Sequence, residues 1–294
     1  MSGTLVARCP AKVNLVLRLL ARRPDGYHEI DTLFQAIDLC DVLEARPAAS
    51  LSLACDDPAL PTDESNLVVR AARRLAERLG LARAGAALAL RKRIPVGAGL
   101  GGASSDAAGA LVVCARLWGA PLGADELAST AAEIGSDVPF FLWGGTARGT
   151  GRGERIAPRP FAGPLELLLG LPPFGIATAE VYRRAQRLTL PGFDVSVFGS
   201  SPLTRSQDHD WGALTNDLER VVFEDWPELR SFRDGLLESG ARSALLSGSG
   251  STVYGIFDSD RARRDAAARL GARFPGWRLE PARAIRDGVR LGAR

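Results

Sequence analysis

Residues 95–108, PVGAGLGGASSDAA, combine glycines with a pair of serines in a pattern suited to binding phosphate. Glycine has no Cβ and tolerates positive φ, so its backbone can approach a ligand closely. A helix is expected from Ala107 to about Leu117, and a helix N-terminus presents unpaired N–H groups and partial positive charge. Ser104 and Ser105 either cap this helix or, as the favoured interpretation, reach phosphate oxygens or a bridging Mg²⁺. The segment predicts a site for a nucleotide or another phosphorylated ligand.

The spacing of Gly97, Gly99 and Gly102 also satisfies G-x-G-x-x-G, the fingerprint of dinucleotide-binding domains. That fingerprint normally opens the first β-α-β unit and has an acidic residue about 20 residues later, at a strand end. Here it lies a third of the way along the chain, and the acidic candidates Asp125 and Glu126 lie in an expected helix. The sequence also lacks G-x-x-x-x-G-K-[ST] and the H-R-D and D-F-G signatures of protein kinases. A dinucleotide-dependent oxidoreductase is therefore the less favoured alternative.

The composition is that of a globular protein with a sizeable core: 294 residues, 46% hydrophobic and 24% charged. The formal net charge of +3 is too small and too evenly spread to indicate a nucleic-acid-binding protein. No apolar run reaches the roughly 18 residues of a membrane span, and no secretory signal is visible. Cys9, Cys40, Cys55 and Cys114 lack metal-ligand spacing. We expect a cytoplasmic monomer or homodimer with reduced thiols, binding neither nucleic acid nor membrane.

Strands and helices mix along the chain without strict β-α-β order, which favours an α+β fold. A strand, a short loop and a second strand are expected over 4–20, and the segment after Asp137 is expected to return to strand. Further strands are expected at 32–39, 41–47, 50–55, 86–96, 165–173 and 243–257. Helices are expected at 67–79, 107–118, 124–134, 179–187, 228–239 and 261–270. A proline cluster around Pro158 predicts the boundary between domains 1–158 and 159–294, and 191–209 reads as an irregular insertion of unassigned role.

Three stretches resemble the motifs of the GHMP kinase superfamily, which includes galactokinase, homoserine kinase and mevalonate kinase. They are Ala11–Leu15, the 95–108 segment and the glycine-rich Leu246–Gly255. Within the superfamily, the strings PAKVNLVL, RRPDGYHEIDTLFQAIDL and GSDVPFFL resemble the kinases of the non-mevalonate isoprenoid pathway that act on a cytidine-diphosphate-linked methylerythritol. The resemblance covers nearly the whole chain.

This resemblance implies a two-domain GHMP kinase fold, with an ATP-binding N-terminal domain like ribosomal protein S5 domain 2 and a ferredoxin-like C-terminal domain. It implies phosphoryl transfer from ATP to the 2-hydroxyl of the cytidylated methylerythritol, with Mg²⁺. Several members of the superfamily hold Mg²⁺ with an acidic residue that has no obvious counterpart here. The metal ligands therefore stay unassigned, and we expect phosphates and water to hold most of the ion.

The resemblance also assigns catalytic roles to Lys12 and Asp137. Asp137 would accept the proton of the attacking hydroxyl, although an aspartate there could instead cap a turn. Lys12, one of only two lysines, would neutralise charge on the transferred group; otherwise it is a surface lysine at a strand end. Asn14 falls on the same strand face as Lys12, where it would orient the substrate hydroxyl.

For the cytidine, the resemblance implies that Tyr27 stacks on the ring, His28 bonds to its edge and Tyr182 covers the opposite face. The residues expected to bind ATP are Asn66, Pro95, Val96, Gly97, Ala98, Gly99, Leu100, Gly101, Gly102, Ala103, Ser104 and Ser105. Those expected to bind substrate are Asn14, Tyr27, His28, Tyr182, Ser247, Gly248 and Ser249. Asn66 could equally cap the helix that starts at Leu67, and Ser247–Thr252 could be a plain glycine corner.

Two other functions remain open at this point. A homoserine or mevalonate kinase would share the glycine loop but should lack the Tyr27–His28 pair. A non-catalytic binding module would show no turnover, which conflicts with the contexts of Lys12 and Asp137.

Overall fold

Two long antiparallel strands, β1 (Leu5–Arg22) and β2 (His28–Arg46), run through the centre of the protein. The structure is a computed structural model that describes residues 3–188 and 210–292. The predicted insertion at 191–209 lies outside the described residues. The prediction of two strands separated by a loop over 4–20 is wrong, because β1 is one continuous strand whose pairing register with β2 shifts between Pro10 and Ala11. A β-bulge lets a strand continue past a residue that cannot donate a ladder hydrogen bond.

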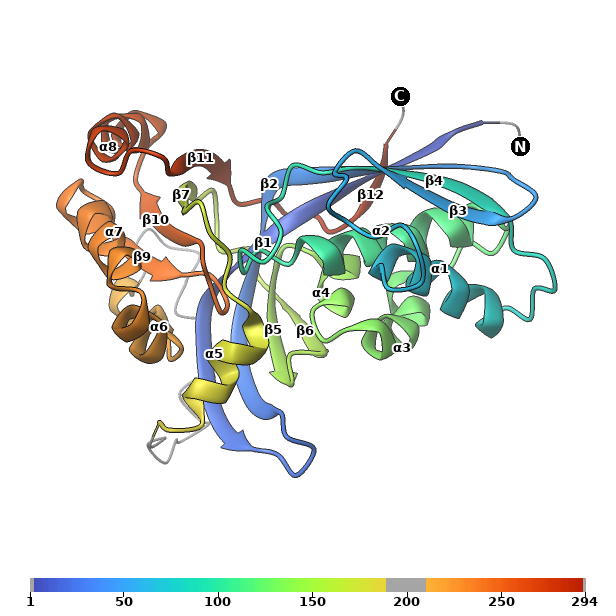
Figure 1. Ribbon diagram of the computed structural model, residues 1–294, viewed down its shortest axis with the longest axis horizontal. Coiled ribbons are helices and arrows are strands. Elements are labelled where there is room, and N and C mark those ends of the chain that lie inside the picture. Colours follow the sequence, from blue (N-terminus) through green and yellow to red (C-terminus); the bar gives the residue numbers. More distant parts are fainter. Residues whose placement is uncertain (1–2, 189–209, 293–294) are drawn as a thin grey trace.

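Within the described residues, β1 and β2 belong to an eight-stranded sheet with the path β12-β1-β2-β4-β3 and branches to β5, β6 and β8. The added strands are β3 (Leu51–Cys55), β4 (Ala86–Arg91), β5 (Thr146–Gly151), β6 (Arg155–Arg159), β8 (Thr215–Asn216) and β12 (Arg290–Gly292). The helices α1 (Leu67–Arg78), α2 (Gly102–Leu117), α3 (Ala124–Ile134) and α4 (Val138–Trp143) pack on one face of this sheet (Figure 1). Their small and aliphatic side chains form a core with the inner face of the strands.

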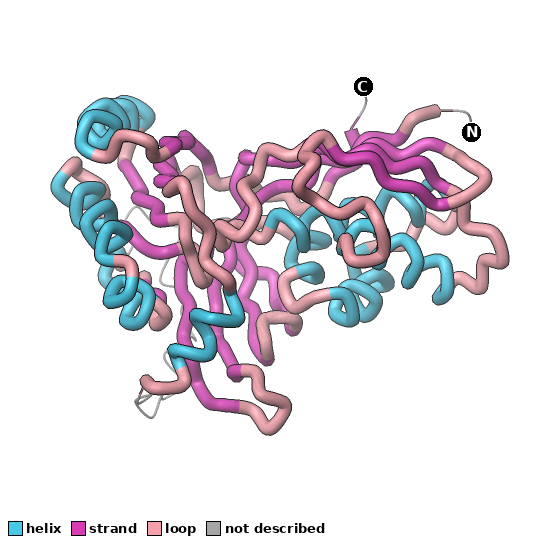
Figure 2. The backbone as a smooth tube through the Cα atoms, viewed as in Figure 1, coloured by secondary structure: helices cyan, strands magenta, loops and turns pink. Residues whose placement is uncertain are grey.

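A second sheet has the antiparallel order β11-β7-β10-β9 within the described part of the chain. Its strands are β7 (Glu166–Leu171), β9 (Ser243–Leu246), β10 (Val253–Phe257) and β11 (Arg278–Arg283). The helices of this half are α5 (Thr178–Ala185), α6 (Glu219–Asp225), α7 (Pro227–Glu238) and α8 (Asp260–Arg273). Since α7 and α8 connect the strands as β-α-β-β-α-β, the predicted ferredoxin-like half is confirmed (Figures 1 and 2).

The two halves of the chain are interleaved through the first sheet. β8 pairs with β1 in parallel and β12 pairs with β1 antiparallel, so segments from beyond residue 159 complete the N-terminal sheet. The boundary after residue 158 stays a prediction. All four cysteines are free thiols. Of the helices in the described ranges, none has the length and apolar character needed to cross a membrane.

Candidate active site

A cavity of about 900 Å³ collects most of the residues singled out in the sequence. Both halves of the chain contribute to its wall, including β1, the turn between β1 and β2, the 95–104 loop, α5 and the glycine-rich turn after β9. The predicted site residues that line it are Lys12, Asn14, Tyr27, His28, Asn66, Pro95–Ser104, Asp137, Tyr182, Gly248 and Ser249. Ser105 and Ser247 do not line the cavity.

The glycine loop depends on left-handed backbone at three alternate positions: φ is 66° at Gly97, 75° at Gly99 and 72° at Gly101. At Gly99 there is also no room for a side chain, because a Cβ would lie 2.0 Å from the carbonyl oxygen of Ser247. Such a conformation strains any L-residue with a side chain and turns successive N–H groups toward one side. The loop therefore has the shape of an anion-binding turn.

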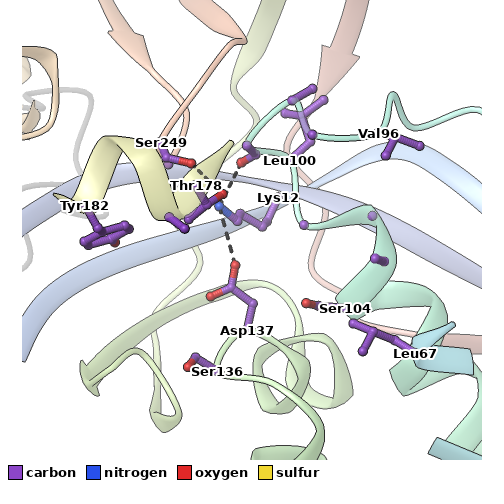
Figure 3. Close-up of a pocket in the computed structure, with 18 of the residues that line it drawn as sticks. Lys12, Leu67, Val96, Leu100, Ser104, Ser136, Asp137, Thr178, Tyr182 and Ser249 are labelled. Carbon is purple, nitrogen blue, oxygen red and sulfur yellow. Dashed lines mark hydrogen bonds and ion pairs between the residues drawn. The ribbon is translucent and has the colours of Figure 1, made fainter. Parts of the chain in front are cut away.

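The helix after the loop begins earlier than expected. Gly101 is its N-cap and α2 starts at Gly102, so Ser104 and Ser105 lie inside the first turn and neither caps it. The capping interpretation is therefore wrong; a glycine in the left-handed region already ends the loop. Ser104 lines the cavity at the N-terminus of α2 (Figure 3). Ser105 is fully buried, and its hydroxyl has no hydrogen-bond partner among the described residues.

Lys12 is a buried cation on the central strand, not a surface lysine. Its Nζ donates to Asn14 Oδ1 at 2.7 Å and to the carbonyl oxygen of Gly99 at 2.8 Å. The amide of Asn14 in turn donates to Thr32 Oγ1 at 2.8 Å. Burial lowers the pKa of the Lys12 ammonium, and the nearby carboxylate of Asp137 opposes this shift. The chain therefore fixes one positive charge beside the phosphate-binding loop.

Asp137 provides the carboxylate that faces this ammonium, with Oδ2 3.8 Å from Lys12 Nζ (Figure 3). It precedes α4 and not a strand, so the strand expected here is wrong. The apolar run VPFFLW carries a proline in its first turn and packs as one short helix against the first core. Although Asp137 stands at the N-cap, its side chain makes no capping hydrogen bond, and 32% of the side chain is exposed. The carboxylate is available to a ligand.

At the other end of the cavity lie three rings. The ring centroids of His28 and Tyr182 are 5.5 Å apart, whereas Tyr27 is 55% exposed. His28 is buried, and its Nδ1 has no partner among the described residues. Burial and the charge of Arg22 lower the pKa of His28 and so favour the neutral form of its ring. A buried polar nitrogen without a partner is costly, and a ligand that supplies the hydrogen bond removes the cost.

The turn between β9 and β10 supports the phosphate-binding loop. Ser247 Oγ donates to the carbonyl oxygen of Gly99 at 3.0 Å, so this serine holds the loop from behind. Asn216 fixes the turn by donating to the carbonyl oxygens of Leu246 and Gly248, both at 2.8 Å. Ser249, which lines the cavity, lies 2.9 Å from Thr178 Oγ1 on α5. The glycine-rich segment Ser247–Thr252 therefore forms a tight turn between two strands and also contributes to the wall of the cavity.

Asn66 caps a helix and also lies in the wall of the cavity. Its Oδ1 accepts from the N–H of Val68 at 2.9 Å and so caps α1, while the residue also lines the cavity. The capping alternative is confirmed, and ATP binding by Asn66 stays a prediction.

Sequence reasoning missed several cavity residues. Lys92 bridges two buried carboxylates, with Nζ 2.5 Å from Asp41 Oδ2 and 2.7 Å from Asp106 Oδ2. Burial raises the pKa of Asp106 to about 7, while the Lys92 ammonium favours its charged form. The rarity of lysine was a usable signal for Lys92, as for Lys12. Arg152 and Thr178 carried no local signal.

The described residues contain no cluster of three or more histidine, cysteine, aspartate or glutamate side chains that could hold a metal ion. Their oxygen donors at the loop end of the cavity include the hydroxyl of Ser104 and the carboxylate of Asp137. This donor set suits a hard cation that keeps most of its water and phosphate ligands, such as Mg²⁺.

Comparisons with known proteins agree with this geometry. The family of GHMP kinases N terminal domains matches residues 66–145, and that of GHMP kinases C terminal domains matches residues 201–276. A 4-diphosphocytidyl-2-C-methyl-D-erythritol kinase from Pelotomaculum thermopropionicum is 43% identical, with 90% of this chain and 93% of that protein covered. One of the same name from Salinibacter ruber is 42% identical, with 95% and 99% covered.

Solved structures extend the agreement to the fold. The crystal structure of a 4-(cytidine 5'-diphospho)-2C-methyl-D-erythritol kinase superposes with a TM-score of 0.79 at 35% identity, covering 98% of this chain and all of that one. A homoserine kinase from Cytophaga hutchinsonii has a TM-score of 0.76 at 20% identity, covering 99% and 98% of the two chains, and shares the fold. The expected two-domain fold is confirmed, and the dinucleotide-binding alternative is not supported. The chain belongs to the GHMP kinases, within the family of 4-diphosphocytidyl-2-C-methyl-D-erythritol kinases.

Proposed function

We propose that this protein transfers the γ-phosphoryl group of ATP to the 2-hydroxyl of 4-diphosphocytidyl-2-C-methyl-D-erythritol, a step of non-mevalonate isoprenoid biosynthesis. One observation carries the proposal. A single cavity has a phosphate-binding loop at one end and aromatic rings at the other, with Lys12 and Asp137 lining it as well. That arrangement suits a donor with a triphosphate and an acceptor with a base and an alcohol.

The loop and the start of α2 hold the triphosphate. Backbone N–H groups between Gly97 and Ser104, together with the positive end of the helix, bind its oxygens. ATP enters with the terminal phosphate directed at the Lys12–Asp137 pair. Mg²⁺, when bound, would reduce the charge on the phosphates. Phosphate oxygens and water would hold most of the ion, and the hydroxyl of Ser104, which lines the cavity, is a protein oxygen that could contribute.

The phosphoryl transfer depends on the carboxylate of Asp137 and the ammonium of Lys12. The substrate oxygen attacks the γ-phosphorus in line, its proton passes to the carboxylate of Asp137, and the bond to the β,γ-bridging oxygen breaks to release ADP. Lys12 stabilises negative charge on the transferred group, and Asn14 holds the ammonium in place through its 2.7 Å hydrogen bond. The pair supplies positioning and electrostatic stabilisation and no covalent intermediate.

The cytosine occupies the end of the cavity with the three rings. His28, buried and neutral, pairs its free Nδ1 with the edge of the base, while Tyr27 and Tyr182 offer ring faces for stacking. This end separates the proposed substrate from homoserine and mevalonate, which carry no base.

An ATP-consumption assay with matched acceptors tests the proposal. We expect turnover with 4-diphosphocytidyl-2-C-methyl-D-erythritol and none above background with homoserine, mevalonate or uncytidylated methylerythritol phosphate. Omission of Mg²⁺ with excess chelator should abolish turnover. Activity confined to an acceptor without the cytidine would contradict the substrate assignment and leave the kinase assignment intact.

A further inference from the structure

Arg152 differs from the other basic residues that line the cavity. Lys12 faces Asp137, Lys92 bridges two aspartates and Arg183 pairs with Glu180. The guanidinium of Arg152 makes no ion pair or side-chain hydrogen bond with any residue in the described ranges, although it lines the cavity. Its one contact of note is the ring of Tyr27, whose centroid lies 4.9 Å away.

The fold places Arg152 between the two ends of the proposed acceptor site. It belongs to the turn from β5 to β6, and Gly151, just before it, pairs with Ile30 of β2, close to the Tyr27 turn. On its other side, a Cβ at Gly153 would be 3.7 Å from Asp137 Oδ1. The turn thus contacts the base end through Arg152 and passes close to the carboxylate end at Gly153.

The turn itself holds the backbone of Arg152 in place. The N–H of Arg152 donates to Glu154 Oε2 at 2.7 Å, and the flanking glycines Gly151 and Gly153 have φ of 76° and 109°. Asp25, an acidic group of the cavity wall whose charge interacts with that of Arg152, is already bound to Arg23 at 3.1 Å and to the N–H of Tyr27. The guanidinium is therefore left with free donors inside the cavity.

We propose that Arg152 binds the diphosphate of the acceptor, the anionic group that joins its base to its alcohol. This rests on the proposed function. A guanidinium presents a planar fork of N–H donors that matches phosphate oxygens in pairs, and it can stack on Tyr27 while doing so. Arg152 is thereby a substrate-binding and specificity residue: it favours a cytidine diphosphate derivative over an uncharged nucleoside.

Binding measurements on the intact enzyme test the proposal. Cytidine, CMP and CDP are titrated by calorimetry into the wild type, Arg152→Gln, Arg152→Lys and the matched control Arg155→Gln. Arg155 is on the same hairpin but exposed, and it lies outside the cavity. We expect Arg152→Gln to weaken CDP binding by about 10- to 100-fold and cytidine binding by less than about twofold. Arg152→Lys should recover part of the loss, and Arg155→Gln should bind as the wild type does.

Steady-state kinetics supply the second readout. Arg152→Gln should raise KM for the cytidylated acceptor by a similar factor, with kcat and KM for ATP nearly unchanged. An equal loss for cytidine and CDP would overturn the proposal, because it would mean that Arg152 acts by holding Tyr27. Unchanged CDP binding would overturn it too. Failure of the proposed function looks different: the wild type itself would then neither bind CDP nor phosphorylate the cytidylated acceptor.

Discussion

Asp137→Asn is expected to lower kcat by about 10²- to 10⁴-fold and to change ATP affinity by less than about twofold. The amide has the shape of the carboxylate but cannot accept the hydroxyl proton. The fold should tolerate the change, because Asp137 makes no capping hydrogen bond to α4. Lys12, left without this counter-charge, keeps its bonds to Asn14 and to the carbonyl oxygen of Gly99. Single-turnover kinetics and ATP titration separate chemistry from binding.

Asp125→Asn is the matched control for this experiment, because Asp125 is exposed in the first turn of α3 and lies outside the cavity. It should turn over as fast as the wild type. An Asp137→Asn enzyme with near wild-type kcat would remove the carboxylate from the reaction, whatever its distance from Lys12.

Lys12→Met is the second large effect: we expect kcat to fall by about 10²- to 10³-fold, since a preorganised charge at the transferred phosphoryl group is lost. Methionine is of similar length and apolar, so the buried site stays filled. The oxygens of Asn14 and Gly99 lose a donor, which should cost roughly 1–3 kcal/mol of stability. Gly99 O keeps its bond from Ser247, and Asp137 remains partly hydrated, so the variant should fold. Thermal unfolding and steady-state kinetics measure the two effects separately.

Lys12→Arg is an informative companion, because it restores the charge with a broader group. The backbone of Gly248 and Gly101 packs closely around Lys12: a Cβ added at Gly248 would lie 3.1 Å from Lys12 Nζ, and one added at Gly101 would lie 3.2 Å from its Cγ. The site therefore leaves little room for a guanidinium. We expect no recovery of kcat.

The Lys12→Met, Asp137→Asn double variant should lose little more kcat than the worse of the two single variants, because the two groups act as a unit. Fully multiplicative losses, or a Lys12→Met enzyme close to wild type, would show that the pair does not act together.

Short-range patterns predicted several elements well. The helix expected at 124–134 is α3, and the apolar stripe of 67–79 is buried as α1. Errors arose where tertiary packing overrides local preference. The sequence predicts a short loop within 4–20, but pairing with β2 on both sides of a bulge keeps β1 continuous past Pro10. The run after Asp137 looked like a strand because it is short and apolar, and periodicity alone does not separate a buried strand from a buried helical turn.

The candidate site shows the same division. Lys12 and Asn14 were placed together by strand alternation, because their spacing of two residues is local. Arg152 reaches Tyr27 only because β5 pairs with β2, and Lys92 meets Asp41 across 51 residues of sequence. No window of sequence contains such contacts. Sequence motifs therefore predicted the residues at the two ends of the cavity, whereas the charged residues between them could be placed only from the three-dimensional structure.

A crystal structure with a non-hydrolysable ATP analogue and 4-diphosphocytidyl-2-C-methyl-D-erythritol bound would test how the cavity orients donor and acceptor. We expect triphosphate oxygens against the N–H groups of Gly97–Ser104, and the 2-hydroxyl within about 2.6–3.2 Å of the Asp137 carboxylate. The γ-phosphorus should lie in line with that hydroxyl, next to Lys12. A triphosphate bound away from this loop, or a hydroxyl out of reach of Asp137 with both ligands present, would contradict this arrangement.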